Sequence, residues 1–141
     1  MAGKPSCPTV LIVDDEEIIV LALTALFSDL GYEVCGSATT APEALRLAAR
    51  LAPGLITMDI NLGSPGEGFA AVTLIRTSDL TTPVLFITGG AEADSGESIR
   101  ALGRAEYVQK PFGPADIVAA LARLALDEDG EGYDEDDPAL N

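Results

Sequence analysis

The stretch Leu55-Ile56-Thr57-Met58-Asp59 decides the fold of this 141-residue chain. Four apolar or β-branched residues favour a buried strand, and the strand then ends in a carboxylate. Three other short runs also end in polar or charged residues: Val10-Leu11-Ile12-Val13 before Asp14-Asp15, Val84-Leu85-Phe86-Ile87 before Thr88, and Tyr107-Val108-Gln109 before Lys110-Pro111. This repetition predicts several strands that each carry a functional side chain at the carboxyl end.

These polar residues are expected to meet at one edge of a sheet. In an open parallel sheet the carboxyl ends of the strands share an edge, and ligands bind in the crevice there. Three carboxylates, one hydroxyl and one ammonium would then lie together. Carboxylate oxygens suit a divalent cation, whereas the ammonium and the hydroxyl suit phosphoryl oxygens. The pattern therefore predicts a site for a metal ion and a phosphoryl group.

Helical patterns separate the strands along the chain. We expect strands at about 9–13, 33–37, 55–59, 84–88 and 107–109, and helices from Glu16 to Gly31, from Thr40 to before Pro53, around Phe69–Ile75, between Ser95 and Leu102, and from Pro114 to Leu126. Five alternating strands and helices predict an α/β fold with a doubly wound parallel sheet and helices on both faces. Right-handed crossovers leave few topologies, and the flavodoxin-like order 2-1-3-4-5 brings the ends of the first and third strands together.

Local signals predict how the first two helices begin and end. Asp15 is expected as the N-cap of the first helix, and Gly31 as its stop. Thr40 followed by Glu43 predicts a capping box at the second helix. The core-facing side of the first helix is expected to carry the residues Ile18, Leu21, Ala22, Ala25 and Leu26.

Composition and charge limit the function. The formal net charge is −15, and residues 127–141 hold eight acids and no base. An acidic surface argues against binding to nucleic acid or to an anionic membrane, because both interactions depend on Lys and Arg. We expect a flexible N-terminus at 1–8, one folded domain at 9–126, and an acidic, disordered tail at 127–141.

The remaining compositional signals indicate a cytoplasmic protein. The chain holds no histidine, and its two cysteines, Cys7 and Cys35, have no metal-ligand spacing. Cys35 is expected to be a small core residue. The N-terminus lacks the apolar stretch of a signal peptide, and no apolar run reaches the length of a membrane span.

Taken together, the strand-end residues resemble those of the response-regulator receiver domain of bacterial two-component signalling. The resemblance spans Thr9 to Leu126 and is strongest to the stand-alone, chemotaxis-regulator-like type. It is carried by the acidic pair Asp14-Asp15, Asp59, Thr88, Lys110-Pro111 and Tyr107, which stands three residues before the lysine. Each match alone is weak, but the full set, in this order and at strand ends, is specific.

The resemblance implies a role for each of these residues. Asp59 would accept a phosphoryl group from a sensor histidine kinase or a histidine phosphotransfer protein. Mg²⁺, or alternatively Mn²⁺, would be held by Asp14, Asp15, Asp59 and the backbone carbonyl of Asn61. Lys110 and Thr88 would contact the phosphoryl oxygens, and Tyr107 would be the aromatic switch. Such a protein signals rather than acting as an ordinary enzyme, although it catalyses its own phosphotransfer and dephosphorylation.

Further positions follow from the same resemblance. Asn61 and Gly90 would tune the lifetime of the phosphorylated state. Ile19 and Leu23, with Phe112, would dock the kinase, although a structural role under neighbouring loops is an equal alternative for this stripe. Because no output domain follows the last helix, the signal would pass by contact with a downstream protein, or the chain would act as a phosphate sink or relay; the sequence leaves these open.

Other α/β classes fit less well. Haloacid-dehalogenase-type phosphatases need an Asp-x-Asp motif after the first strand, whereas this pair is adjacent. Dinucleotide-binding domains need Gly-x-Gly-x-x-Gly there, and flavodoxins need a hydroxyl-rich phosphate loop. The remaining alternative is a phosphorylation-independent pseudo-receiver that serves as an interaction module, which would be expected to lack at least one key residue.

Overall fold

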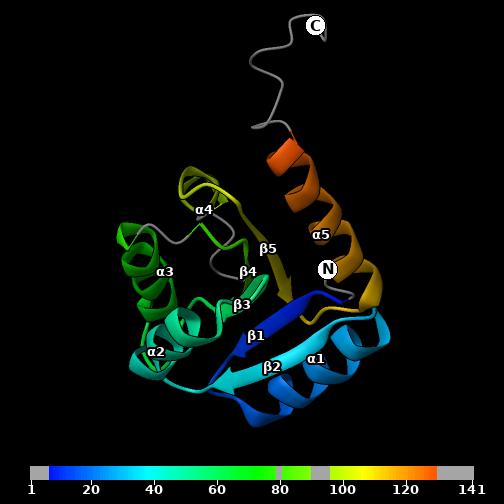
Figure 1. Cartoon of the computed structure of the whole chain (residues 1–141), viewed down its shortest axis with the longest axis horizontal. Coiled ribbons are helices and arrows are strands. Elements are labelled where there is room, and N and C mark those ends of the chain that lie inside the picture. Colours follow the sequence, from blue (N-terminus) through cyan, green and yellow to red (C-terminus); the bar gives the residue numbers. More distant parts are fainter. Residues whose placement is uncertain (1–6, 79–80, 90–95, 130–141) are drawn as a thin grey trace, which may run out of the picture.

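The computed structural model describes residues 7–78, 81–89 and 96–129. Its strands are β1 (Thr9–Val13), β2 (Glu33–Ala38), β3 (Leu55–Asp59), β4 (Val84–Gly89) and β5 (Ala105–Lys110). Its helices are α1 (Glu17–Asp29), α2 (Ala41–Leu51), α3 (Glu67–Thr77), α4 (Gly96–Ala101) and α5 (Pro114–Asp129) (Figure 1). None of the helices in these ranges combines the length and the hydrophobicity that a membrane span requires.

The five strands form one parallel sheet in the order β2-β1-β3-β4-β5, which confirms the predicted topology. The register explains why the strand ends meet. Val13 pairs with Met58, so Asp14 follows β1 at the level of Asp59. Asp59 in turn pairs with Ile87, and Gly89 pairs with Lys110. The residues that follow or end β1, β3, β4 and β5 therefore share one edge of the sheet.

The helices cover the sheet as two layers (Figure 1). Helices α1 and α5 pack on one face, and α2, α3 and α4 pack on the other. Alternate residues of each strand supply the two cores: Val10 and Ile12 face α1 and α5, whereas Leu11 and Val13 face the other layer. Burial on both faces accounts for the continuous apolar character of the strands.

The core-facing side of α1 differs from the prediction. Ile18 is 74% exposed and Leu21 66% exposed, whereas Leu23 and Phe27 are fully buried. The helix carries apolar residues around most of its circumference, so periodicity alone did not identify the buried face. Tertiary contacts decided it: Leu23 and Phe27 join the core formed by Val10 and Ile12 of β1. Phe27 also packs edge-to-face on Tyr32, just before β2, with ring centroids 5.0 Å apart.

The ends of the first two helices match the prediction only in part. Asp15 is not the N-cap of α1; Glu16 takes that place, and its amide donates to Asp14 Oδ1 instead. Gly31, with φ +96°, ends the helix as predicted. Thr40 caps α2 by accepting from the Glu43 amide, although the Glu43 carboxylate reaches back to the amide of Thr39, one residue before the cap.

The last helix is longer than predicted. It runs to Asp129, so residues 127–129 are helical and do not belong to a disordered tail. Residues 130–141, the rest of the predicted tail, lie outside the described ranges, as do residues 1–6. Helix α4 is short, at six residues, and agrees with the predicted position between Ser95 and Leu102.

Candidate functional site

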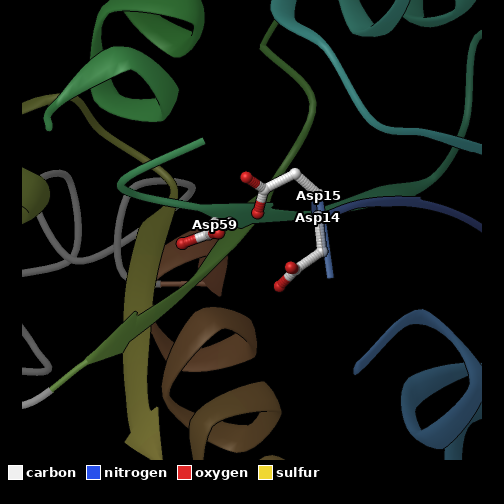
Figure 2. Close-up of side chains that lie close together, drawn as sticks. All are labelled: Asp14, Asp15 and Asp59. Atoms are coloured by element: carbon white, nitrogen blue, oxygen red, sulfur yellow. The ribbon is translucent and has the colours of Figure 1, made fainter. Parts of the chain in front are cut away.

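Three carboxylates gather at the carboxyl edge of the sheet. Asp14 and Asp15 follow β1, and Asp59 is the last residue of β3. One oxygen from each lies within 4.8 Å of the others, and Figure 2 shows the three side chains grouped together. Asp14 is fully buried, Asp59 is 6% exposed, and Asp15 is open to solvent.

Each carboxylate is held by a backbone amide. Asp14 Oδ1 accepts from Glu16 at 2.8 Å, and Asp59 Oδ1 accepts from Asn61 at 3.1 Å. Asp15 Oδ2 accepts from Gly63, in the loop after β3, at 3.3 Å. These bonds fix the orientation of all three groups while leaving a second oxygen on each for another ligand.

The clustering shifts the pKa values of the buried acids. Burial raises the pKa of Asp14. Burial, and then the neighbouring Asp14 charge, raise the pKa of Asp59 from 3.8 to about 6, although Lys110 partly opposes the change. Asp59 is therefore mostly ionised at neutral pH, in a site that disfavours its negative charge.

Lys110, the last residue of β5, extends its ammonium into the same site. Its Nζ lies 3.2 Å from Glu16 Oε1, 3.6 Å from Asp14 Oδ2 and 4.0 Å from Asp59 Oδ2. Burial opposes its charge, but the carboxylates of Asp14 and Asp59 outweigh burial and raise the Lys110 pKa. The sequence prediction placed Lys110 here but missed Glu16, whose only signal was its place in the acidic run after β1.

Thr88 lies near the end of β4, one residue after Ile87, which pairs with Asp59. Its side chain is fully buried, and its Oγ1 has no hydrogen-bond partner among the described residues. A buried hydroxyl without a partner is uncommon, and at a ligand site it indicates a group whose partner is supplied from outside.

Tyr107 lies on β5, next to β4, where it pairs with Phe86. Its ring is partly buried against the core that lies under α2, α3 and α4, and the guanidinium of Arg100 lies 5.5 Å from the ring centroid. A Cβ atom on Gly96, at the start of α4, would lie only 3.2 Å from the tyrosine hydroxyl. Tyr107 therefore fills the space between the sheet and the first turn of α4.

Two positions, Asn61 and Gly90, are predicted to tune the lifetime of the phosphorylated state, and Asn61 lies in the loop after β3. The Asn61 side chain turns toward the following loop, where its Oδ1 accepts from the Gly66 amide at 2.9 Å. Its backbone amide binds Asp59. Gly90 lies outside the described residues.

Gly68 supports the strand end that carries Asp59, and the sequence pattern did not identify it. A Cβ atom there would overlap the Asp59 carbonyl oxygen, at 1.8 Å. The Gly68 amide donates to the carbonyl of Ile60 at 2.8 Å. Glycine thus lets the first turn of α3 pack directly on the backbone of the strand end that carries Asp59, a close approach that no local pattern reveals.

The predicted docking residues need a correction. Leu23 is fully buried and cannot contact a partner. Ile19 and Phe112 are partly buried and pack against the core beneath α1 and α5. The exposed apolar side chains of α1 are instead Ile18 and Leu21, because the helix presents the opposite face to the sheet.

The donor set suits a hard divalent cation. Asp14, Asp15 and Asp59 supply carboxylate oxygens, which Mg²⁺ and Mn²⁺ prefer, and the described residues contain no thiol or imidazole at the site. Asp14 Oδ2 is buried without a hydrogen bond, and its ion pair with Lys110 is long, at 3.6 Å, so this oxygen could also bind a cation. The residues present therefore fit a magnesium ion.

Comparison with known proteins agrees with this geometry. Residues 10–122 match the family model of the response regulator receiver domain. The chain is 38% identical over 117 residues to the phyllosphere-induced regulator PhyR of Methylorubrum extorquens, an alignment that covers 81% of this chain and 42% of PhyR. It is 33% identical over 117 residues to the chemotaxis protein CheY of Thermotoga maritima, covering 82% of this chain and 96% of CheY.

Solved structures give the same result. The receiver domain of NtrX from Brucella abortus superposes with a TM-score of 0.73 at 30% identity, over 82% of this chain and 96% of that domain. The receiver domain of PhyR from Erythrobacter litoralis superposes with a TM-score of 0.70 at 29% identity, over 85% of this chain and 91% of that domain. The chain therefore spans nearly all of a CheY-sized protein, but less than half of the longer PhyR regulator.

Proposed function

The chain belongs to the family of response regulator receiver domains, and from this premise we propose that it accepts a phosphoryl group on Asp59. The donor is a phosphohistidine of a sensor histidine kinase or of a histidine phosphotransfer protein. One observation carries the proposal: a nearly buried carboxylate lies within reach of a lysine, beside two further acids suited to a cation.

The reaction is a direct transfer to the carboxylate. An Asp59 oxygen attacks the phosphorus, a P–O bond forms, and the P–N bond breaks with its electron pair returning to the imidazole. The amide of Asn61 fixes the orientation of the attacking group through its bond to Asp59 Oδ1. Since the Asp59 pKa is about 6, the carboxylate is mostly ionised, as a nucleophile must be, at neutral pH.

Neutralisation of charge provides most of the catalysis of such a transfer. The Lys110 ammonium and the Thr88 hydroxyl would bind phosphoryl oxygens, a role supported by the 4.0 Å distance from Lys110 to Asp59 and by the absence of a hydrogen-bond partner for Thr88 Oγ1 among the described residues. Asp14 and Asp15, with Asp59 and the Asn61 carbonyl that the family pattern implies, would hold Mg²⁺ or Mn²⁺. When bound, that ion would offset negative charge on the carboxylates and the phosphoryl oxygens.

The signal passes to the neighbouring face through Thr88 and Tyr107. When the Thr88 hydroxyl moves toward a phosphoryl group, it vacates space beside β5, and Tyr107 turns further inward. The tyrosine hydroxyl rests against Gly96, so this movement is transmitted to the short helix α4. Asn61 and Gly90 remain the positions proposed to control hydrolysis.

Helices α4 and α5 flank β5 and form the proposed readout surface. Buried Glu106 on β5 binds Arg100 of α4, with a closest distance of 3.3 Å, and Arg123 of α5 at 3.1 Å. These ion pairs join the three elements, so a shift of α4 alters the surface as a unit. A downstream protein would read that surface. If the chain instead acts as a phosphate sink or relay, transfer of the phosphoryl group is sufficient and no change of this surface is required.

The kinase is proposed to dock on α1. Ile18 and Leu21 are exposed apolar residues close to the acidic pair, and a helical bundle that carries phosphohistidine could cover them while reaching Asp59. A groove of about 510 Å³ adjoins them, lined by Asp15, Glu17, Val20, Leu21, Ser37 and Thr39. This location replaces the predicted docking through Leu23.

Labelling with a phosphohistidine donor tests the proposed function. The wild type should gain one phosphoryl group in the presence of Mg²⁺, and Asp59→Asn should gain none, as measured by intact mass. Asp29→Asn, which neutralises an exposed acid at the far end of α1, is the matched control and should be labelled like the wild type. Stoichiometric labelling of Asp59→Asn in a folded protein would refute the assignment.

A further inference from the structure

The nearest partner of Lys110 is not the proposed phosphoacceptor. Its ammonium lies 3.2 Å from Glu16, a hydrogen-bonded ion pair, but 4.0 Å from Asp59. Charge-assisted hydrogen bonds between nitrogen and oxygen measure about 2.7–2.9 Å, so the ammonium must move by roughly 1 Å to bind Asp59 or a group attached to it.

Glu16 is fixed at its backbone. Its amide donates to buried Asp14 Oδ1 at 2.8 Å, and its carbonyl accepts from Ile19 and Val20 as the first turn of α1 begins. Lys110 likewise emerges from the last position of β5. Two rigid elements thus place the carboxylate and the ammonium opposite each other, and the ion pair joins the start of α1 to the end of β5.

We propose that Glu16 is a positioning residue that holds Lys110 away from Asp59 and thereby slows phosphoryl acceptance. This inference rests on the proposed function. For Lys110 to bind the incoming phosphoryl oxygens, its ion pair with Glu16 must break. The free energy needed to break this ion pair adds to the activation barrier for phosphoryl acceptance, because the pair is intact in the resting protein and broken in the transition state.

Hydrolysis should respond differently. Once Asp59 carries the phosphoryl group, Lys110 is already bound to it, and the Glu16 pair is broken in both the phosphorylated protein and the transition state for water attack. Removing the Glu16 charge should therefore speed acceptance and leave hydrolysis unchanged. A general loss of negative charge, or a loosened site, would instead change the rates of both acceptance and hydrolysis.

The size of the effect follows from exposure. The Glu16 side chain is 58% exposed and that of Lys110 is 21% exposed, so the pair resembles the partly exposed ion pairs whose interaction energies are small. We expect Glu16→Gln to raise the acceptance rate about two- to fivefold.

The experiment compares Glu16→Gln with Glu33→Gln in the full chain. Glu33 is an exposed acid at the first position of β2, away from the carboxyl edge of the sheet, and its substitution changes the net charge by the same amount. Acceptance is measured with phosphoramidate and Mg²⁺, and hydrolysis after removal of the donor. Glu16→Gln should raise only the acceptance rate, and Glu33→Gln should change neither rate by more than about twofold.

A Lys110→Gln background provides the second readout. Acceptance should be slower there, and adding Glu16→Gln should have no further effect, because the lysine through which Glu16 acts is absent. The inference is overturned by equal effects of the two glutamate substitutions, by a parallel change in hydrolysis, by no change in acceptance, or by an effect that persists without Lys110. If the wild type is not labelled on Asp59 at all, the proposed function itself fails, which is a separate result.

Discussion

Replacing Asp59 with asparagine should stabilise the fold in the absence of divalent metal, although it removes the proposed phosphoacceptor. The ionised Asp59 side chain is 8% exposed and lies beside Asp14. Asparagine has nearly the same shape and keeps an oxygen that can accept from the Asn61 amide. The substitution therefore removes a buried charge while retaining the hydrogen bond.

The magnitude follows from the pKa. Folding raises the Asp59 pKa from 3.8 to about 6, so the folded protein binds this proton more tightly than the unfolded chain. The resulting contribution to stability is fully present below about pH 4 and is lost as the pH rises through about 6. The difference between a pKa of 3.8 and one of about 6, at about 1.4 kcal/mol per pH unit, makes the ionised group unfavourable by about 3 kcal/mol at neutral pH.

The attraction of Lys110 is already included in the pKa of about 6, but the asparagine NH₂ is a new buried donor, and desolvating it offsets part of the gain. We therefore expect Asp59→Asn to raise the free energy of unfolding by about 1–3 kcal/mol at about pH 7.5. For a domain of this size the melting temperature should rise by about 3–10 °C. Near pH 4 the difference should largely disappear, because the native carboxyl is then protonated.

The assay is thermal and urea unfolding with a chelator present, at about pH 7.5 and about pH 4. Asp29→Asn is the control: it removes an exposed charge outside the site and should change the free energy of unfolding by less than about 0.5 kcal/mol. Equal or lower stability of Asp59→Asn at the higher pH would refute the reasoning, as would a gain that is the same at both pH values.

Three further substitutions separate the roles of the site and its supports. Asp15→Ala should abolish the rise in melting temperature that millimolar Mg²⁺ gives the wild type, since it removes an exposed donor from the cluster. Ile18→Glu should slow phosphotransfer from the kinase but not labelling by phosphoramidate, whereas Leu23→Ala should lower the free energy of unfolding by about 2–5 kcal/mol without that selectivity. Gly68→Ala should destabilise the fold by at least about 2 kcal/mol and slow labelling of Asp59 by both donors, because its Cβ would displace α3 from the end of β3. A kinase-specific defect in Leu23→Ala, or a Gly68→Ala protein with normal melting, would contradict these assignments.

The sequence predicted the sheet and its chemical edge because both depend on short, strongly patterned segments. Strands buried on both faces read as continuous apolar runs, and parallel topology then forces their polar ends together. The face of α1 was predicted wrongly for a physical reason: apolar residues surround the helix, and the choice between Leu21 and Leu23 depends on contacts with the sheet and with Tyr32.

Other features depend on contacts between distant segments and have no local signal. The Glu16–Lys110 pair joins residues 94 positions apart. The need for glycine at 68 arises only when α3 is placed against the Asp59 carbonyl. Both became visible once the elements were assembled in three dimensions.

Buried polar groups without hydrogen-bond partners, among the described residues, indicate where the folded state loses free energy. Three buried side-chain oxygens lack a hydrogen bond, and two of them, Asp14 Oδ2 and Thr88 Oγ1, lie at the proposed site; the third, on Thr57, has no role that the structure explains. An unsatisfied buried polar group costs about 1–3 kcal/mol, and the buried charge of Asp59 adds to this. A cation beside Asp14 and a phosphoryl group beside Thr88 would relieve these costs, and Lys110 could then leave Glu16 for a stronger partner. The resting site is thus destabilised in the groups that the proposed ligands would satisfy, so their binding should favour the rearranged state through β4 and β5.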